Sequence, residues 1–303
     1  MHKFRDSVPA SINNLYNSRL AVIFESIIIG LFTGLVVVFF RFSLSKADGL
    51  RKGIYESLKS LPLYCLLLWI LVLVVIGLFL GWAAKIKPMI KGSGIPQVKG
   101  ALQRKMTLGW RTELPLKIIT GILSIGTGLS LGREGPSIQI GAYVGKGVLS
   151  VFHRNHADRK LLFTAASAAG LAAAFNAPLA GVLFVLEEFE TAFSPIYMAC
   201  VMGASMTADA VAGYFFGAKP VFDFYQIAVL PLGEIYWVIL LGIICGLLGA
   251  LFKEGLYFFL NLYDRLRIPQ LFRPIIPLMV SIPLSFFFLK RQGEGMILSK
   301  HCR

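Results

Sequence analysis

The sequence predicts an all-α integral membrane protein, and two observations lead to this class. Of the 303 residues, 56% are hydrophobic and only 15% are charged, with a mean hydropathy of +0.71, whereas about a quarter of a soluble domain is charged. Several apolar stretches also reach the roughly 20 residues that a helix needs to cross a hydrocarbon core. Residues 63–84 contain no charge, and residues 20–40 contain a single acid, Glu25.

Apolar stretches predict the helices in chain order. The first is too long for the core of a signal peptide, so we interpret it as a retained transmembrane helix that follows a cytoplasmic N-terminal segment, 1–19. The basic residues between 41 and 59 are expected in a loop. The predicted spans lie near 20–41, 62–84, 112–130, 134–151, 159–175, 178–190, 197–217, 234–263 and 271–290.

Several predicted helices are too short to cross a bilayer alone. Joints rich in Gly and Pro separate them at 91–100, 128–136 and 175–178. Helices interrupted in this way are typical of transporters. Inside a membrane, backbone without helical hydrogen bonds is tolerated only where it is buried in protein or lines a water-filled cavity. The pattern therefore indicates a site at these joints.

The net charge of +14 does not indicate a nucleic-acid partner, because the bases lie between apolar spans rather than on one soluble face. The positive-inside rule explains this distribution. Residues 85–111 hold seven bases and no acid, so this segment is expected to be cytoplasmic. Two spans separate it from the N-terminus, which is expected on the same side. The five bases between 41 and 59 leave the opposite orientation as the alternative.

Neither the histidines nor the cysteines form a pattern that is typical of a catalytic or metal site. The four histidines lie in tails or loops, which argues against a membrane enzyme. The four cysteines are scattered without paired spacing, so we predict no disulfide framework, no metal site and no cofactor.

An internal repeat relates the two ends of the chain. Gly30, Gly34 and the Phe40-Arg41 pair recur 212 residues later, as Gly242, Gly246 and Phe252-Lys253, and Pro62 corresponds to Pro274 at the same offset. A chance alignment of packing glycines is the alternative. If the repeat is real, the counterpart of Gly92 falls at 304, so the second repeat is expected to be truncated.

The first motif is Gly92-Ser93-Gly94-Ile95-Pro96. The glycines allow unusual torsions and Pro96 suits the first turn of a helix. Such a helix would direct unpaired N–H groups and the positive end of its dipole towards Ser93, which favours an anion held by neutral donors. An ordinary helix cap is the alternative.

The second motif is Gly132-Arg133-Glu134-Gly135-Pro136, which also precedes an apolar helix. Glu134 falls in the first turn, where a carboxylate can occupy the place of an anion, and protonation would release it. An acid between long apolar runs is costly unless it has a role or a partner. A surface pair of Arg133 with Glu134 is the alternative.

The third motif ends the apolar helix predicted near 178–190 with Glu187 and Glu188. Two adjacent acids at a helix end could form a proton entry point. They lie about 100° apart on a helix, so their roles can differ. Solvated acids at a helix end are the alternative.

Together these motifs resemble the CLC family of chloride channels and chloride/proton antiporters. The matching stretches are GSGIP at 92–96, GREGP at 132–136 and AAFNAPLAGVLFVLEE at 173–188, and the resemblance runs from about Leu20 to about Leu289. It implies an inverted-repeat helical fold with discontinuous, tilted helices. The first repeat, 20–217, is then complete, residues 234–290 are the first two helices of a truncated second repeat, and 291–303 form a polar tail that matches nothing.

The resemblance also implies roles for particular residues. Glu134 is similar to the external gating glutamate and Glu188 to the internal proton-transfer glutamate. Where many bacterial members have an acid, this chain has Lys99, and Gln97 replaces a glutamate, so both residues depart from the internal proton route. The implied chloride-binding residues are Ser93, Gly94, Ile95, Pro96, Arg133 and Gly135.

The function implied by the resemblance is transmembrane chloride transport, with chloride/proton antiport in the full-length form. A passive chloride channel is one alternative, and a non-transporting truncated remnant or assembly partner is another. The family's second anion-binding loop, Gly-x-Phe-x-Pro, and its pore tyrosine have no match here, so the chain alone is not expected to transport.

The partners that follow are chloride, protons and the lipid bilayer, with no nucleic acid. A homodimer is expected of full-length members, an expectation that does not extend to this fragment. Because no cytoplasmic regulatory domain is appended, we expect a multi-pass protein of the bacterial inner (plasma) membrane.

Overall fold

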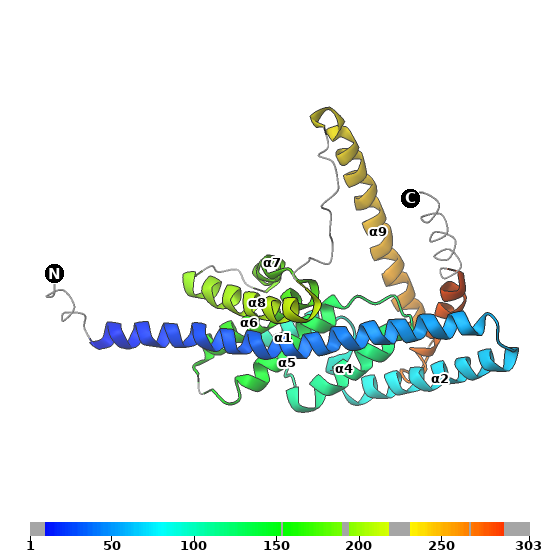
Figure 1. The fold of residues 1–303 in the computed structure, drawn as a ribbon, viewed down its shortest axis with the longest axis horizontal. Helices are drawn as coiled ribbons and strands as arrows, with labels where there is room; N and C mark the ends of the chain where they lie inside the picture. The colour runs from blue at the N-terminus through cyan, green and yellow to red at the C-terminus, as the bar shows by residue number, and fades with distance from the viewer. Residues whose placement is uncertain (1–9, 153, 190–193, 218–230, 267, 288–303) are drawn as a thin grey trace.

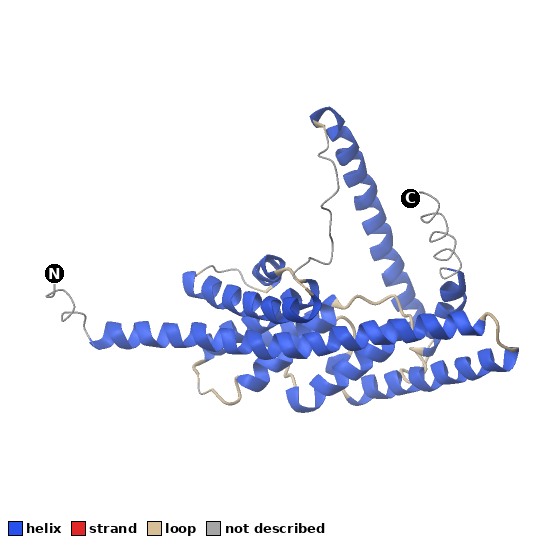
Figure 2. Ribbon diagram, viewed as in Figure 1, coloured by secondary structure: helices blue, strands red, loops and turns tan. Residues whose placement is uncertain are grey.

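The computed structural model describes residues 10–152, 154–189, 194–217, 231–266 and 268–287, and helices joined by loops make up this part of the chain (Figure 2). The predicted tail 291–303 and residues 1–9 of the N-terminal segment lie outside it. The α-helices are α1 (Ala10–Leu58), α2 (Leu63–Ile86), α3 (Ile95–Leu102), α4 (Trp110–Gly126), α5 (Glu134–Val148), α6 (His156–Phe175), α7 (Pro178–Glu188), α8 (Pro195–Phe216) and α9 (Ile235–Arg265). Two 3₁₀ turns, η1 (Pro88–Ile90) and η2 (Leu232–Glu234), and a short apolar helix, Ile275–Phe287, complete the description.

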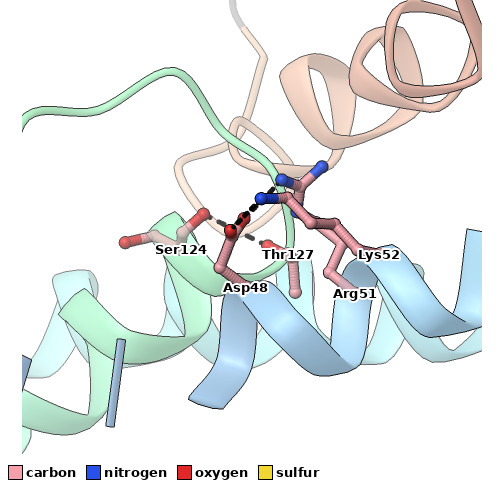
Figure 3. Close-up of polar contacts among 5 residues, drawn as sticks. All are labelled: Asp48, Arg51, Lys52, Ser124 and Thr127. Carbon is pink, nitrogen blue, oxygen red and sulfur yellow. Dashed lines mark hydrogen bonds and ion pairs between the residues drawn. The ribbon is translucent and has the colours of Figure 1, made fainter. Parts of the chain in front are cut away.

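The expected loop at 41–59 is wrong, because α1 continues as helix to Leu58. Two of its basic residues pair with an acid one turn away: Asp48 lies 2.9 Å from Lys52 and 2.5 Å from Arg51 (Figure 3). Ion pairs three and four residues apart support a helix. This part of α1 also packs on the end of α4, where a Cβ atom at Gly126 would lie 2.6 Å from the Cβ of Ala47.

Four of the described helices are long and apolar enough to cross a membrane by length and composition: 19–58 within α1, and α2, α8 and α9. The remaining helices are shorter or less apolar, as the Gly- and Pro-rich joints predict. Pro178 and Pro195 stand in the first turns of α7 and α8, where the missing N–H costs no hydrogen bond.

The core is built around α6. Every residue from Leu162 to Ala174 is buried, and most are Ala, Gly or Ser. Small side chains let α1, α5, α7 and α8 approach this helix closely. At the C-terminal end of α6, Arg41 of α1 donates hydrogen bonds to the carbonyl oxygen of Ala173 and to Asn176 Oδ1, both at 2.6 Å.

The single acid of the first apolar span has a partner. Arg154, in the loop before α6, donates hydrogen bonds to both carboxylate oxygens of Glu25, the shortest at 2.7 Å. Hydrogen bonding to this carboxylate raises the pKa of the Arg154 guanidinium. The pair removes the cost of an isolated charge inside an apolar span.

The corresponding glycines of the two predicted repeats differ in their packing. On α1, a Cβ atom at Gly30 would lie 2.8 Å from the Cα of Ala204 in α8, so the glycine is required for helix contact. On α9, no described atom lies within 4 Å of a Cβ built at Gly242 or Gly246, and no residue of Ile235–Arg265 is buried. Figure 1 shows α1 along the bundle and α9 standing away from it.

Candidate functional site

The start of α3 has the backbone geometry that its motif predicts. Gly92 and Gly94 have φ of +63° and +99°, values that side chains with a Cβ rarely adopt. Gly94 is the N-cap, and Pro96 stands in the first turn. No side chain caps this helix, so its first N–H groups remain available to a ligand.

The start of α5 has the same character. Arg133 is its N-cap residue and Glu134 its first helical residue, and again no side chain caps the first turn. A helix N-terminus carries about half a positive charge, which favours either the Glu134 carboxylate or an anion in its place.

The two helix starts meet. A Cβ atom at Gly135 would overlap the carbonyl oxygen of Ser93 and lie 2.8 Å from the Ser93 Cβ. A Cβ atom at Gly94 would lie 2.8 Å from the Cβ of Gln139, one turn further along α5. Glycine at both positions therefore lets α3 and α5 bring their N-terminal ends together. Gln139 also donates hydrogen bonds to the carbonyl oxygen of Met89 and to the Tyr143 hydroxyl.

A cavity of about 530 Å³ opens beside this contact. Ser93 and Glu134 are both exposed and both line it, together with Ile95 and Gly135. Gly94, Pro96 and Arg133 are not among its lining residues. The other residues around it are Leu80, Ala84, Ile90, Gly92, Lys117, Thr120, Gly121, Ser124, Ile125, Leu129, Leu131, Gly132, Pro136 and Pro274.

Arg133 directs its side chain towards α6 instead. Its guanidinium carbon lies 5.1 Å from the ring centroid of Phe175, the last residue of that helix. An arginine stacked on an aromatic face gains a cation–π interaction. No Arg133–Glu134 ion pair occurs among the described residues, so the alternative of a surface pair is not what this region of the structure contains.

Lys117 is a lining residue that the sequence reasoning missed. It lies in α4 with 3% of its surface exposed, and its ammonium donates hydrogen bonds to the carbonyl oxygens of Ile90 and Gly92, at 2.9 and 3.0 Å. It thereby fixes the turn that leads into Ser93 and adds a positive charge beside the cavity. A single base within the predicted 112–130 span is the signal that could have identified it.

The acids at the end of α7 take different environments. Glu188 forms an ion pair with Lys99 of α3, with Nζ and Oε1 2.9 Å apart, while Glu187 is exposed. Lys99 lies four residues after Ile95 on α3, about 6 Å along the helix axis, and Ile95 lines the cavity. One short helix therefore connects the cavity to the ion pair with Glu188.

Among the described residues, no group of three or more His, Cys, Asp or Glu side chains lies close enough to hold a metal ion. The chemistry of the site is that of two positive helix ends, a hydroxyl, a buried ammonium and one carboxylate. This set can hold a small anion, and the carboxylate can take up or release a proton.

Comparisons with known proteins were made by sequence and by structure. A family model described as voltage gated chloride channel matches residues 76–301. The H(+)/Cl(-) exchange transporters ClcA of Salmonella schwarzengrund and Salmonella agona are each 37% identical over 244 residues, which cover 78% of this chain and 50% of each relative. The chain thus spans about half the length of the curated relatives it matches.

Solved structures share the fold. A slow cyanobacterial Cl⁻/H⁺ antiporter superposes with a TM-score of 0.80 at 29% identity, covering 88% of this chain and 63% of that one. A CLC-type fluoride/proton antiporter has a TM-score of 0.72 at 24% identity, covering 89% and 66%. A eukaryotic CLC transporter has a TM-score of 0.70 at 23% identity, covering 88% and 49%. At these two identities, below 25%, the similarity shows a shared fold and nothing further.

Proposed function

Because this chain belongs to the voltage-gated chloride channel (CLC) family, we propose that it serves chloride transport across a membrane in exchange for protons. Membership places it among transport proteins rather than enzymes. Relatives named H(+)/Cl(-) exchange transporters support the choice of antiport.

One observation carries the proposal: the uncapped starts of α3 and α5 meet at a cavity that Ser93 and Glu134 both line. Two helix dipoles and a hydroxyl hold a halide reversibly. The Lys117 ammonium also lines the cavity, and it is engaged by the carbonyl oxygens of Ile90 and Gly92. Chloride binding is assigned to Ser93, Gly94, Ile95, Pro96, Arg133 and Gly135, through backbone N–H groups where these are present and the Ser93 hydroxyl.

Glu134 is assigned the role of external gate. Its carboxylate sits in the first turn of α5 beside the cavity, where it competes with chloride for the same positive helix end. Protonation removes that competition, since the neutral acid no longer gains from the dipole. Glu188, at the end of α7, is assigned internal proton transfer.

Wider assignments rest on the same family membership. Residues 20–217 are proposed as the first repeat and 234–290 as the beginning of the second. The partners are chloride, protons and the lipid bilayer, and full-length members are expected to be homodimers. The location proposed is the inner membrane of a bacterium, as the Salmonella relatives are bacterial proteins.

The test is Glu134→Gln in the protein as the cell makes it, reconstituted into liposomes. Glutamine keeps the size of the side chain and cannot exchange a proton, so chloride efflux should persist while proton movement falls to background. Chloride and proton fluxes are measured together with ion-selective electrodes.

The matched control is Glu56→Gln, an exposed acid near the end of α1, which should leave both fluxes unchanged. Proton movement that remains in fixed ratio to chloride in Glu134→Gln would contradict the gate assignment.

A passive chloride channel is the second candidate, and the ion pair of Lys99 with Glu188 favours it. A carboxylate held by an ammonium must leave that partner before it carries a proton. Chloride flux without proton movement in the unmodified protein would select this candidate over antiport.

A further inference from the structure

A second cavity, of about 590 Å³, lies at the opposite end of α3 from Ser93. Three segments enclose it: the end of α3 with the loop 103–109, the end of α5, and the start of α6. None of its lining residues lines the cavity beside Ser93 and Glu134, so it lies outside the proposed chloride site.

Basic side chains from all three segments reach this second cavity: Arg104 from the loop, Lys146 from α5, and Arg159 and Lys160 from α6. His156 joins them. The fold assembles this charge, since Arg104 and Arg159 are distant in the chain. Among the described residues that line the cavity there is no Asp or Glu.

The acid nearest to these bases in the sequence does not line the cavity. Asp158 precedes Arg159 in α6, but it is not among the lining residues. Lys146 is held in place by donating a hydrogen bond to the carbonyl oxygen of Leu108. Arg104 adopts a left-handed conformation, with φ of +58°, as the chain turns after α3.

Apart from Thr107, the rest of the wall is apolar, and its larger side chains are Leu102, Met106, Leu149 and Phe163. A volume of this size is far larger than a halide needs and falls within the range of small-molecule sites, about 300–1,000 Å³. Guanidinium groups match the geometry of phosphate oxygens, and lysines bind phosphate as point charges. The cavity therefore suits a phosphate group attached to a partly apolar body.

We propose that this cavity binds a phosphate-bearing ligand, either the headgroup of an anionic phospholipid or a soluble phosphate compound. Basic pockets between membrane helices on the cytoplasmic side are suited to such headgroups, and the positive-inside rule assigns residues 85–111 to that side. An occupant would contact the C-terminal end of α3, the helix that carries Ile95 and Lys99.

The test is direct binding to the full chain in lipid nanodiscs, and it requires no transport. Inorganic pyrophosphate is titrated calorimetrically into nanodiscs of phosphatidylcholine. Retention of phosphatidylglycerol is measured in parallel by native mass spectrometry on protein from mixed bilayers. Pyrophosphate binding identifies a soluble ligand, and retention of phosphatidylglycerol without pyrophosphate binding identifies a lipid.

Two variants locate the binding. Arg104→Gln with Arg159→Gln removes two exposed charges of the cavity and should weaken binding at least about tenfold, since two charge-assisted contacts are lost. Ala157→Phe narrows the cavity while every charge remains, and it should also weaken binding.

The control, Lys85→Gln with Lys105→Gln, removes the same charge from exposed positions that do not line the cavity. It should change binding less than about twofold. If neither probe binds the unmodified chain, or if the control weakens binding as much as the cavity variants do, the proposal is overturned. Thermal unfolding of each variant checks that it remains folded.

Discussion

At the scale of single residues, the contact between two helix starts depends on Gly135. Its Cα faces the Ser93 backbone with no room for a methyl group. Gly53 on α1 has no described atom within 4 Å of the position that a methyl group would take and does not line the cavity beside Ser93, so it provides the comparison. The proposed chloride site can therefore be disturbed without altering a charge or a hydrogen-bonding side chain.

Gly135→Ala should push the start of α5 away from Ser93. Overpacking a close contact costs about 1–3 kcal/mol, and chloride affinity should fall because the two helix ends separate. Isothermal titration with chloride and thermal unfolding measure the two effects. Gly53→Ala should lower neither quantity, and equal losses in the two variants would contradict the contact's role.

The ion pair of Lys99 with Glu188 is the other residue-scale feature with consequences for the mechanism. Its side chains are 44% and 38% exposed, so the pair contributes at most about 1 kcal/mol to stability. Its effect is expected on the proton route rather than on folding.

Lys99→Gln should accelerate proton movement in the reconstituted protein by up to about fivefold, the factor that ~1 kcal/mol represents. Glu188 then takes a proton without first leaving an ammonium. Proton flux measured with a pH electrode checks this, with Lys105→Gln as control. An unchanged proton flux in Lys99→Gln would show that the pair does not limit proton transfer.

At the scale of helices, glycines that correspond in the repeat have different surroundings. Gly30 of α1 packs against Ala204 of α8, whereas its counterpart Gly242 on α9 meets no described atom within 4 Å. The sequence pattern is shared, and the packing is not.

Gly30→Ala should destabilise the chain by about 1–3 kcal/mol, because α1 and α8 must separate to admit a methyl group. Gly242→Ala should be neutral or slightly stabilising, since Ala is favoured over Gly in a helix by up to about 1 kcal/mol. Unfolding in detergent, followed by circular dichroism, gives both values. Similar losses in the two variants would contradict the α1–α8 packing.

At the scale of the whole molecule, the order of helices defines which loops share a side of the membrane. α2 has 24 residues and is about 36 Å long, enough to cross a hydrocarbon core of about 30 Å. Ser60 precedes it, and Gln103 follows it after the short α3; both are exposed.

Ser60→Cys and Gln103→Cys should therefore react from opposite sides, with Gln103→Cys reacting from the cytoplasm. The chain's own four cysteines are first replaced by serine. Labelling with a membrane-impermeant maleimide is compared in right-side-out and inside-out vesicles. Reaction of both positions from one side would overturn the crossing, and reversed sides would overturn the cytoplasmic assignment.

The sequence by itself determined the membrane class and where α3, α5 and α7 begin. The start of α1 was missed, because this helix begins at Ala10, inside the segment that was expected to precede it. Gly94, Pro96 and Glu134 mark helix starts because torsional freedom, a missing N–H and a carboxylate near a dipole act within one turn. Helix ends were less well predicted. The charged stretch after Arg41 was expected as a loop, but ion pairs one turn apart let a helix of 49 residues continue through it.

Only the tertiary structure decided which helix starts meet and which charges pair. Ser93 and Gly135 are 42 positions apart, and Lys99 and Glu188 are 89 apart; no local preference encodes such distances. The contact of Ser93 with Gly135 arises because glycine at positions 94 and 135 lets α3 approach α5, and α5 is in turn packed on the small side chains of α6. Close packing thus brings separate local signals together at the proposed chloride site.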